Sequence, residues 1–298
     1  MTLKGSLSGK NVLVKLLFWF GIMALLTSVT LVLWALLVAD KQSVSALKLL
    51  QVLQTFSVFV LPALMAAWLW AEKPLQWLHL DKGFSWRLAV LVPLTVLILS
   101  PAINMLSVMN QHIELPSFMA DIEQAMREKE DQATWLTELF ARVDTVPALL
   151  LNLLIMAVLP ALGEELCFRG TCQGLFPKSR PHVAIWCTAI LFSAIHFQFY
   201  GFIPRMLLGA LLGYLLYWSG SLYLPMLAHA TNNAIAVVCY YMVEKGWITD
   251  EAVDTLGSGD TLWVGLLSLA VGLLGVYRIW RSAARPQSST PPLSAPRE

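Results

Sequence analysis

The chain has 298 residues, of which 57% are hydrophobic and only 13% are charged. Soluble domains carry roughly a quarter charged residues, and the mean hydropathy here is +0.66. These values exclude a soluble globular protein. They also exclude a disordered chain, which needs low hydrophobicity and high net charge. A formal net charge of +1 disfavours nucleic acid as a partner. We therefore expect an all-α membrane protein, with the lipid bilayer as its surroundings.

Eight continuous apolar runs follow one another along the chain, and most approach the roughly 20 residues that a spanning helix needs. They predict membrane helices at residues 16–39, 49–71, 88–109, 147–172, 182–199, 202–218, 221–243 and 261–280. Transmembrane strands would instead alternate apolar and polar residues. The first run is too long for the apolar part of a signal peptide, so we expect a retained helix. The predicted fold is a polytopic bundle of about eight transmembrane helices.

The segments between these helices divide the chain into four parts. They are an N-terminal group of membrane helices at 1–146 with a polar insertion at 110–146, a helical core at 147–243, a last loop and final helix at 244–280, and a tail at 281–298. The tail is rich in Pro and Ser, which predicts disorder. Within the insertion, apolar residues at three- and four-residue steps predict one or two surface helices on the outer leaflet. A solvated helix is favoured there over a substrate gate.

Positive charge sets the expected orientation, because cytoplasmic loops are enriched in Lys and Arg. Basic residues precede the first helix, lie between the second and third and between the fourth and fifth, and follow the eighth. Acidic residues dominate at 110–146 and 244–260, while Lys41 and Lys48 go against the rule. We expect both termini in the cytoplasm and the protein in the cell (inner) membrane.

Ionisable side chains inside the fourth predicted helix are candidate functional groups, because each costs about 2.5–3.5 kcal/mol to insert at a bilayer centre. Glu165 and Arg169 have the four-residue spacing and the order that favour an ion pair. Adjacent helix positions differ by about 100°, so Glu164 and Glu165 are not expected to share a face. Glu164 then has no partner on its own helix, which makes it a candidate general acid or base. The alternative is that both glutamates are solvated at the cytoplasmic interface.

Two further predicted helices each carry a histidine. Phe192 and His196 share a helix face, so the phenyl ring is expected to pack beside the imidazole. His229 shares a face with both Asn232 and Asn233, and the spacing does not choose between the two asparagines. Two histidines and a glutamate on three helices point to a functional site rather than to isolated hydrogen bonds.

The sequence alone places Glu164, His196 and His229 at different depths in the bilayer. At 1.5 Å per residue, His196 is expected about 9 Å further out than Glu164 and His229. A helix tilt or a cavity must absorb that difference. Small residues such as Gly209 on the sixth predicted helix allow the helices to pack closely.

Three motifs occur in order on separate predicted helices: Glu-Glu-x-x-x-Arg at 164–169, Phe-x-x-x-His at 192–196 and His-x-x-x-Asn at 229–233. Together they resemble the CPBP intramembrane proteases. That family includes the eukaryotic CAAX-processing endopeptidase and bacterial bacteriocin-processing and immunity proteins. The likeness covers residues 147–243, which are therefore expected to form the catalytic core.

The resemblance implies hydrolysis of peptide bonds at an intramembrane site, with a peptide or a membrane protein as the substrate. In the family, the first glutamate and the histidine of the second motif hold and activate water. Here these residues are Glu164 and His196. The third motif stabilises the oxyanion, which implies that role for His229 and Asn233 and favours Asn233 over Asn232.

The other motif residues are expected to support the site, with Glu165 and Arg169 as a structural pair and Phe192 beside them. Glutamate and two histidines also form a catalytic zinc set. Its ligands would be Glu164, His196 and His229. Glu165 would then be the remaining base, which the ion pair opposes, and no His-Glu-x-x-His motif occurs. We expect no cofactor, and zinc is the alternative.

Two other functions compete with proteolysis. A non-catalytic membrane adaptor or bacteriocin self-immunity factor would keep the fold, although the intact motifs argue against it. A proton-coupled transporter would use buried Glu and His, but no inverted repeat supports it. Arg205 is expected to snorkel from a helix end, and binding of a substrate carboxylate is its alternative role.

Overall fold

The computed structural model describes residues 3–283, and its regular elements there are all helices. The α-helices are α1 (Val12–Leu37), α2 (Val44–Gln54), α3 (Leu61–Trp70), α4 (Pro74–Trp77), α5 (Trp86–Gln111), α6 (Ala120–Ala141), α7 (Val146–Asn152), α8 (Leu159–Glu165), α9 (Pro181–Ala194), α10 (Phe202–Ser219), α11 (Tyr223–Glu244), α12 (Asp250–Thr255) and α13 (Leu262–Ala283). The π-helical segments are η1 (Thr55–Val60), η3 (Leu153–Val158) and η4 (Leu166–Cys172). Short 3-10 turns are η2 (Ser117–Met119), η5 (Gln173–Leu175), η6 (Phe199–Gly201) and η7 (Gly259–Thr261). The all-α bundle is confirmed.

Six helical stretches in the described part of the chain are long and apolar enough to cross a membrane. They are Val12–Leu37, Val44–Trp70, Trp86–Gln111, Val146–Leu175, Phe199–Ser219 and Gly259–Ala283. The chain is therefore an integral membrane protein, but the expected count of eight spans is not confirmed. The other two predicted runs are helical and fall short for different reasons. α9 has only 14 residues, and polar residues between His229 and Asn233 lower the hydropathy of α11.

The ends of the helices are set by ordinary local chemistry. Asn11, Ser43 and Ser85 accept a backbone N–H three residues on and so cap α1, α2 and α5. α10 ends at Gly220, whose φ of 65° is the left-handed conformation that glycine adopts without strain.

Apolar side chains on α1 stay exposed, as with Leu36 at 76%, which fits a helix surface in contact with lipid.

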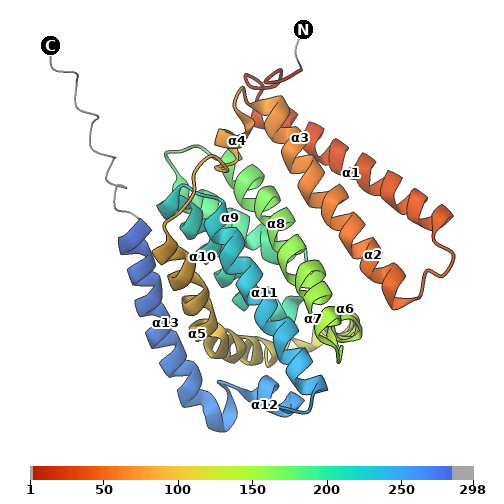
Figure 1. Ribbon diagram of the computed structural model, residues 1–298, viewed down its shortest axis with the longest axis vertical. Coiled ribbons are helices and arrows are strands. Elements are labelled where there is room, and N and C mark those ends of the chain that lie inside the picture. The colour runs from red at the N-terminus through yellow and green to blue at the C-terminus, as the bar shows by residue number, and fades with distance from the viewer. Residues whose placement is uncertain (1–2, 284–298) are drawn as a thin grey trace.

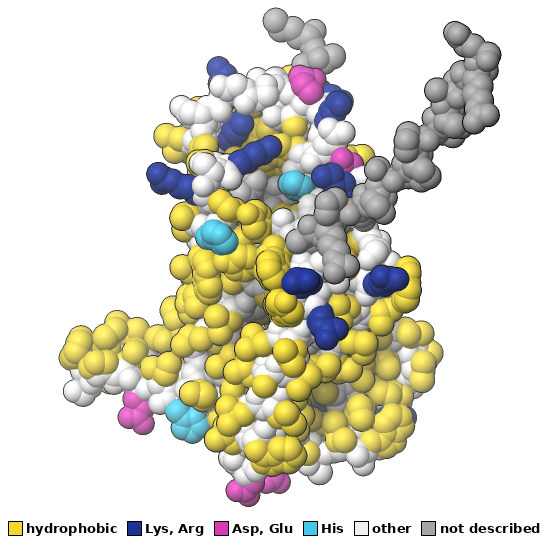
Figure 2. Space-filling model, turned by 90° about the vertical axis from the view of Figure 1, so that its left-hand side faces the viewer, with side chains coloured by type: hydrophobic (Ala, Val, Ile, Leu, Met, Phe, Trp, Pro, Cys, Tyr) yellow, Lys and Arg dark blue, Asp and Glu magenta, His cyan; other side chains and the backbone are white. Residues whose placement is uncertain are grey.

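Basic side chains are concentrated at one end of the bundle. α1 begins and α13 ends at one end, while α6 and α12 lie at the other (Figure 1). Lys and Arg side chains gather over the first end in Figure 2, and hydrophobic side chains cover the middle and lower part of that face. A concentration of Lys and Arg at one end is the bias that the positive-inside rule describes for a membrane protein.

The polar insertion forms one long helix, α6, rather than a pair. It packs against α2, α7, α11 and the turn η6, and Asn152 on α7 donates to the carbonyl of Phe140 at 2.7 Å. The helix therefore covers part of the core instead of being solvated on all sides. At the other terminus, α13 continues to Ala283, so residues 281–283 are helical and not part of a disordered tail. The rest of that predicted tail, 284–298, lies outside the described residues.

Candidate active site

The candidate site begins where α8 passes into the π-helical segment η4. Glu164 and Glu165 end α8, and Arg169 lies within η4. A π-helical turn inside an α-helix is rare and often marks a functional site. Just before the glutamates, a Cβ on Gly163 would lie 3.0 Å from Thr55 Cγ2 and 3.1 Å from Phe59 Cβ. The absence of a side chain at Gly163 therefore lets α8 pack closely against η1.

Glu165 and Arg169 form the predicted ion pair. Arg169 Nη1 lies 2.7 Å from Glu165 Oε1, and neither side chain has any exposed surface. Arg169 Nη2 also donates to the carbonyl of Gly209 on α10 at 2.9 Å, and the guanidinium lies 4.5 Å from the centre of the Phe192 ring. The guanidinium thus ties η4 to α9 and α10, in addition to neutralising Glu165.

His229 on α11 contacts both carboxylates. Its Nδ1 is 2.8 Å from Glu165 Oε1, and its Nε2 is 3.8 Å from Glu164 Oε2. An ionised carboxylate can only accept, so Nδ1–H donates to Glu165 and Nε2 is turned toward Glu164. Glu164 therefore finds its contact on α11, not on its own helix, and the imidazole of His229 links the two carboxylates.

His196 lies just beyond the end of α9, where the chain turns. Its Nδ1 donates to the carbonyl of Phe192 at 2.8 Å, which leaves Nε2 as the ring's acceptor. The centre of the Phe192 ring is 5.2 Å from that of His196 and 5.6 Å from that of His229, with steep interplanar angles. Phe192 thus packs against both imidazoles and brings the second and third motifs together.

The two glutamates differ in their access to solvent. The Glu164 side chain is 14% exposed and the Glu165 side chain 0%. Glu164 Oε2 has no hydrogen-bond partner among the described residues. Neither carboxylate is solvated at an interface, so that alternative is wrong. Glu165 Oε2 is likewise buried without a partner, so the two glutamates differ in the partial exposure of the rest of the Glu164 side chain and in the arginine that only Glu165 contacts.

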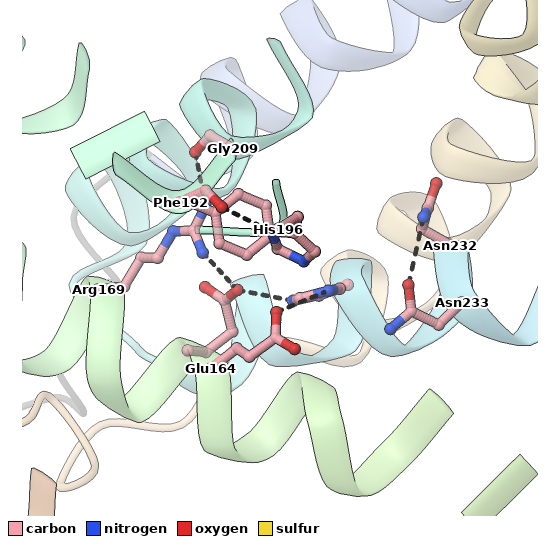
Figure 3. A network of polar contacts seen from close by, with 9 residues as sticks. Glu164, Arg169, Phe192, His196, Gly209, Asn232 and Asn233 are labelled. Atoms are coloured by element: carbon pink, nitrogen blue, oxygen red, sulfur yellow. Dashed lines mark hydrogen bonds and ion pairs between the residues drawn. The ribbon is translucent and has the colours of Figure 1, made fainter. Parts of the chain in front are cut away.

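The asparagines are not part of this contact group. Asn232 Nδ2 donates to Asn233 Oδ1 at 3.4 Å, and Figure 3 shows both residues to one side of His196 and Glu164. Within residues 3–283, Asn233 makes no hydrogen bond to Glu164, His196 or His229. The structure does not decide which asparagine acts.

The alternative zinc set does not fit this arrangement. Within the part of the chain that the structure describes, no three or more His, Cys, Asp or Glu side chains are placed to hold a metal ion. Nδ1 of each histidine is engaged, by Glu165 or by the Phe192 carbonyl, and Nε2 would be the nitrogen that binds a metal. We therefore derive no step through a metal.

Sequence reasoning missed a set of partners around Arg205. Arg205 Nη2 donates to Gln198 Oε1 at 3.0 Å, and Gln198 Nε2 donates to Glu130 Oε1 on α6 at 3.2 Å. The expectation that Arg205 snorkels from a helix end is thus wrong, because its guanidinium is hydrogen-bonded to neighbouring chain. An arginine in an apolar run signals a need for a partner, but nothing in the sequence indicates Gln198.

Comparison with known proteins supports the motif assignment. Residues 146–235 match the family described as type II CAAX prenyl endopeptidase Rce1-like. The matched segment contains all three motifs, so the resemblance is confirmed there. The uncharacterized protein YpbD of Bacillus subtilis (strain 168) is 31% identical over 88 residues, which are 28% of this chain and 43% of that relative. The match thus spans less than half of the relative's length. No solved structure matches this chain.

Proposed function

We propose that this membrane protein, whose residues 146–235 belong to the Rce1-like family of type II CAAX prenyl endopeptidases, is an intramembrane endopeptidase of the CAAX-protease and bacteriocin-processing type. The observation that carries the proposal is the placement of His229 between two unlike carboxylates. Glu165 is neutralised by Arg169 and sealed from solvent, whereas the Glu164 side chain is partly exposed and makes no contact with Arg169.

Glu164 is the general base in this proposal, and His196 helps to hold the water. With Nδ1 donating to the Phe192 carbonyl, His196 Nε2 accepts a hydrogen bond from the water. Glu164 takes one proton from the water, whose oxygen forms a bond to the carbonyl carbon. Glu164 then returns that proton to the departing amine as the C–N bond breaks. Proton transfer by a positioned side chain contributes about 10²–10⁴-fold to a rate.

His229 and Asn233 are the proposed donors to the oxyanion, as the family resemblance implies. Glu165 fixes the His229 ring through Nδ1, so that Nε2 is the nitrogen directed to the reacting carbonyl and, when protonated, the donor. Asn233 has to turn away from Asn232 to join it. Loss of one oxyanion donor typically lowers kcat by about 10²–10³-fold. Such a site takes a peptide or a membrane protein within the bilayer as its substrate.

The experiment compares the membrane proteomes of cells that make the native protein, His196→Ala or the matched control His182→Ala. His182 is exposed and lies outside the contact group. Under the proposal, the same full-length membrane proteins accumulate only with His196→Ala. A peptide spanning the cleavage site is then cut by the native protein in lipid nanodiscs. If no full-length membrane protein accumulates with His196→Ala, and the variant still performs the protein's role in the cell, the non-catalytic adaptor is favoured instead.

A further inference from the structure

Arg205 is a charged residue that the proposed reaction does not use, although it lies within the apolar helical stretch Phe199–Ser219. An ionisable side chain in such a stretch is costly, and it usually marks a functional site and has a specific partner. The partner here is Gln198. Arg205 Nη2 donates to Gln198 Oε1 at 3.0 Å, and Nη1 donates to the carbonyl oxygen of Gln198 at 3.3 Å. Arg205 therefore holds both the side chain and the backbone of one residue.

Gln198 belongs to the bend at residues 195–198, which carries His196. α9 ends at Ala194, and Phe197, directly after the histidine, has a φ of 53°. A bulky residue at positive φ is an outlier, and such a conformation persists only where the surrounding structure enforces it. The bend therefore depends on contacts from other elements, and Arg205 supplies two of them at a point two residues after His196.

The other side of Gln198 is held by α6. Gln198 Nε2 donates to Glu130 Oε1 at 3.2 Å. Burial raises the pKa of the Glu130 carboxyl, an effect that Arg205 opposes. The chain after the bend is held separately by α5, because Asn110 Nδ2 donates to the carbonyl oxygen of Phe199 at 2.7 Å. Gln198 is thus the residue through which α6 and α10 reach the backbone next to His196.

We infer that Arg205 and Gln198 are positioning residues for His196. Because His196 Nδ1 donates to the carbonyl of Phe192, the imidazole is tied to the backbone at the end of α9. The direction of the bend then decides where Nε2 points, and Arg205 fixes that direction through Gln198. The inference rests on the proposed function, which gives His196 the task of holding the water. A misplacement of about 1 Å at a reacting group can lower a rate by about 10²-fold.

The first test separates position from charge. Two carboxylates act on the Arg205 charge, Glu130 and then Glu164 of the candidate site, so Arg205→Ala changes charge and position together. Gln198→Ala removes the link to the bend and keeps the charge. Gly201→Ala also keeps it, and the added Cβ would lie 2.9 Å from Arg205 Nη2. That contact displaces the guanidinium from Gln198.

We expect all three variants to lower kcat for a cleaved peptide by about 10–10²-fold and to leave KM within about twofold. The controls are Gln124→Ala, which removes an exposed hydrogen bond on α6, and Gly21→Ala, whose added Cβ meets nothing within 4 Å. Both should behave like the native protein. A loss of rate confined to Arg205→Ala would assign the effect to charge and overturn the inference. A raised KM with unchanged kcat would overturn it too, because it would make Arg205 a substrate contact.

The second test reads the position of His196 without cleavage. Diethyl pyrocarbonate modifies accessible imidazole nitrogens, and mass spectrometry follows the rate at each histidine of the full chain in detergent. His182, which is exposed on α9, is the internal reference. We expect Gln198→Ala and Gly201→Ala to change the rate at His196 several-fold relative to His182, and an unchanged ratio in both overturns the inference. If the native protein cleaves no peptide, the proposed function fails, while this ratio still decides whether Arg205 and Gln198 hold the bend.

Discussion

Arg169 Nη1 lies 2.7 Å from Glu165 Oε1, and both side chains are sealed from solvent. The same oxygen of Glu165 accepts from His229, so one carboxylate holds a cation on one side and an imidazole on the other. A carboxylate that is paired with an arginine and sealed from solvent is poorly suited to taking protons from water. In the described part of the chain, Glu164 has no arginine partner and its side chain is 14% exposed, and this difference between adjacent glutamates leads to most of the predictions below.

Glu165→Gln should destabilise the protein strongly, because it leaves the Arg169 charge buried and unpaired. Breaking a fully buried pair costs about 3–5 kcal/mol. We expect a lower melting temperature in detergent and a lower yield, with partial recovery when Arg169→Gln is added. The control is the partly exposed pair of Glu123 and Arg127 on α6, where the same changes should lower the melting temperature much less, because water screens the pair. Equal effects at both pairs would contradict a structural role for Glu165.

Gly209→Ala should also be destabilising, because there is little room for a side chain at that point of α10. An added Cβ would lie 3.1 Å from Phe192 Cδ1 and 3.3 Å from both Ala189 Cα and Arg169 Nη2. The substitution pushes α10 away from the site and weakens the bond from Arg169 to the Gly209 carbonyl. Gly21→Ala on α1 is the control, since nothing lies within 4 Å of its added Cβ. Similar melting temperatures for the two variants would show that the close approach at Gly209 is not needed.

A chelator should leave cleavage of a reconstituted peptide largely intact. Among residues 3–283, the candidate ligands are not grouped as a zinc site requires. The measurement is the cleavage rate before and after incubation with the chelator, followed by added zinc. Loss of activity that zinc restores would reverse the prediction and make Glu164, His196 and His229 ligands.

Reporter fusions should place the two ends of the bundle on opposite sides of the membrane. The basic residues gather at the end where α1 begins and α13 ends (Figures 1 and 2), which the positive-inside rule assigns to the cytoplasm. A fusion at Ser289 should report the cytoplasm, and one at Gln132 in α6 the opposite side. The same side for both fusions would refute the proposed topology.

Local features of the fold and the site follow from the sequence. Apolar runs predict where the helices are, because hydropathy acts segment by segment. The spacing of Glu165 and Arg169 predicts their pair, because a four-residue step is a fixed distance on a helix. The histidines and asparagine stand out, because polar groups are costly in an apolar run.

Relations between helices do not follow in the same way. The placement of His229 between Glu164 and Glu165 depends on how α11 packs against α8, and that angle is not encoded in spacing. The π-helical segment η4 also changes the direction of the residues that follow it. The α-helical rotation per residue therefore does not give the directions of those side chains. The link from Arg205 through Gln198 to Glu130 joins parts of the chain that no periodicity relates.

The most direct test of the central claim measures cleavage rate and melting temperature together for Glu164→Gln and Glu165→Gln. Gln keeps the size of the side chain but cannot take a proton. The account predicts that Glu164→Gln stays folded and loses about 10²–10⁴-fold in rate, because it removes the base and no ion pair. It predicts that Glu165→Gln melts at a markedly lower temperature than the native protein. A stable but inactive Glu165→Gln beside an active Glu164→Gln would contradict the account and reverse the two roles.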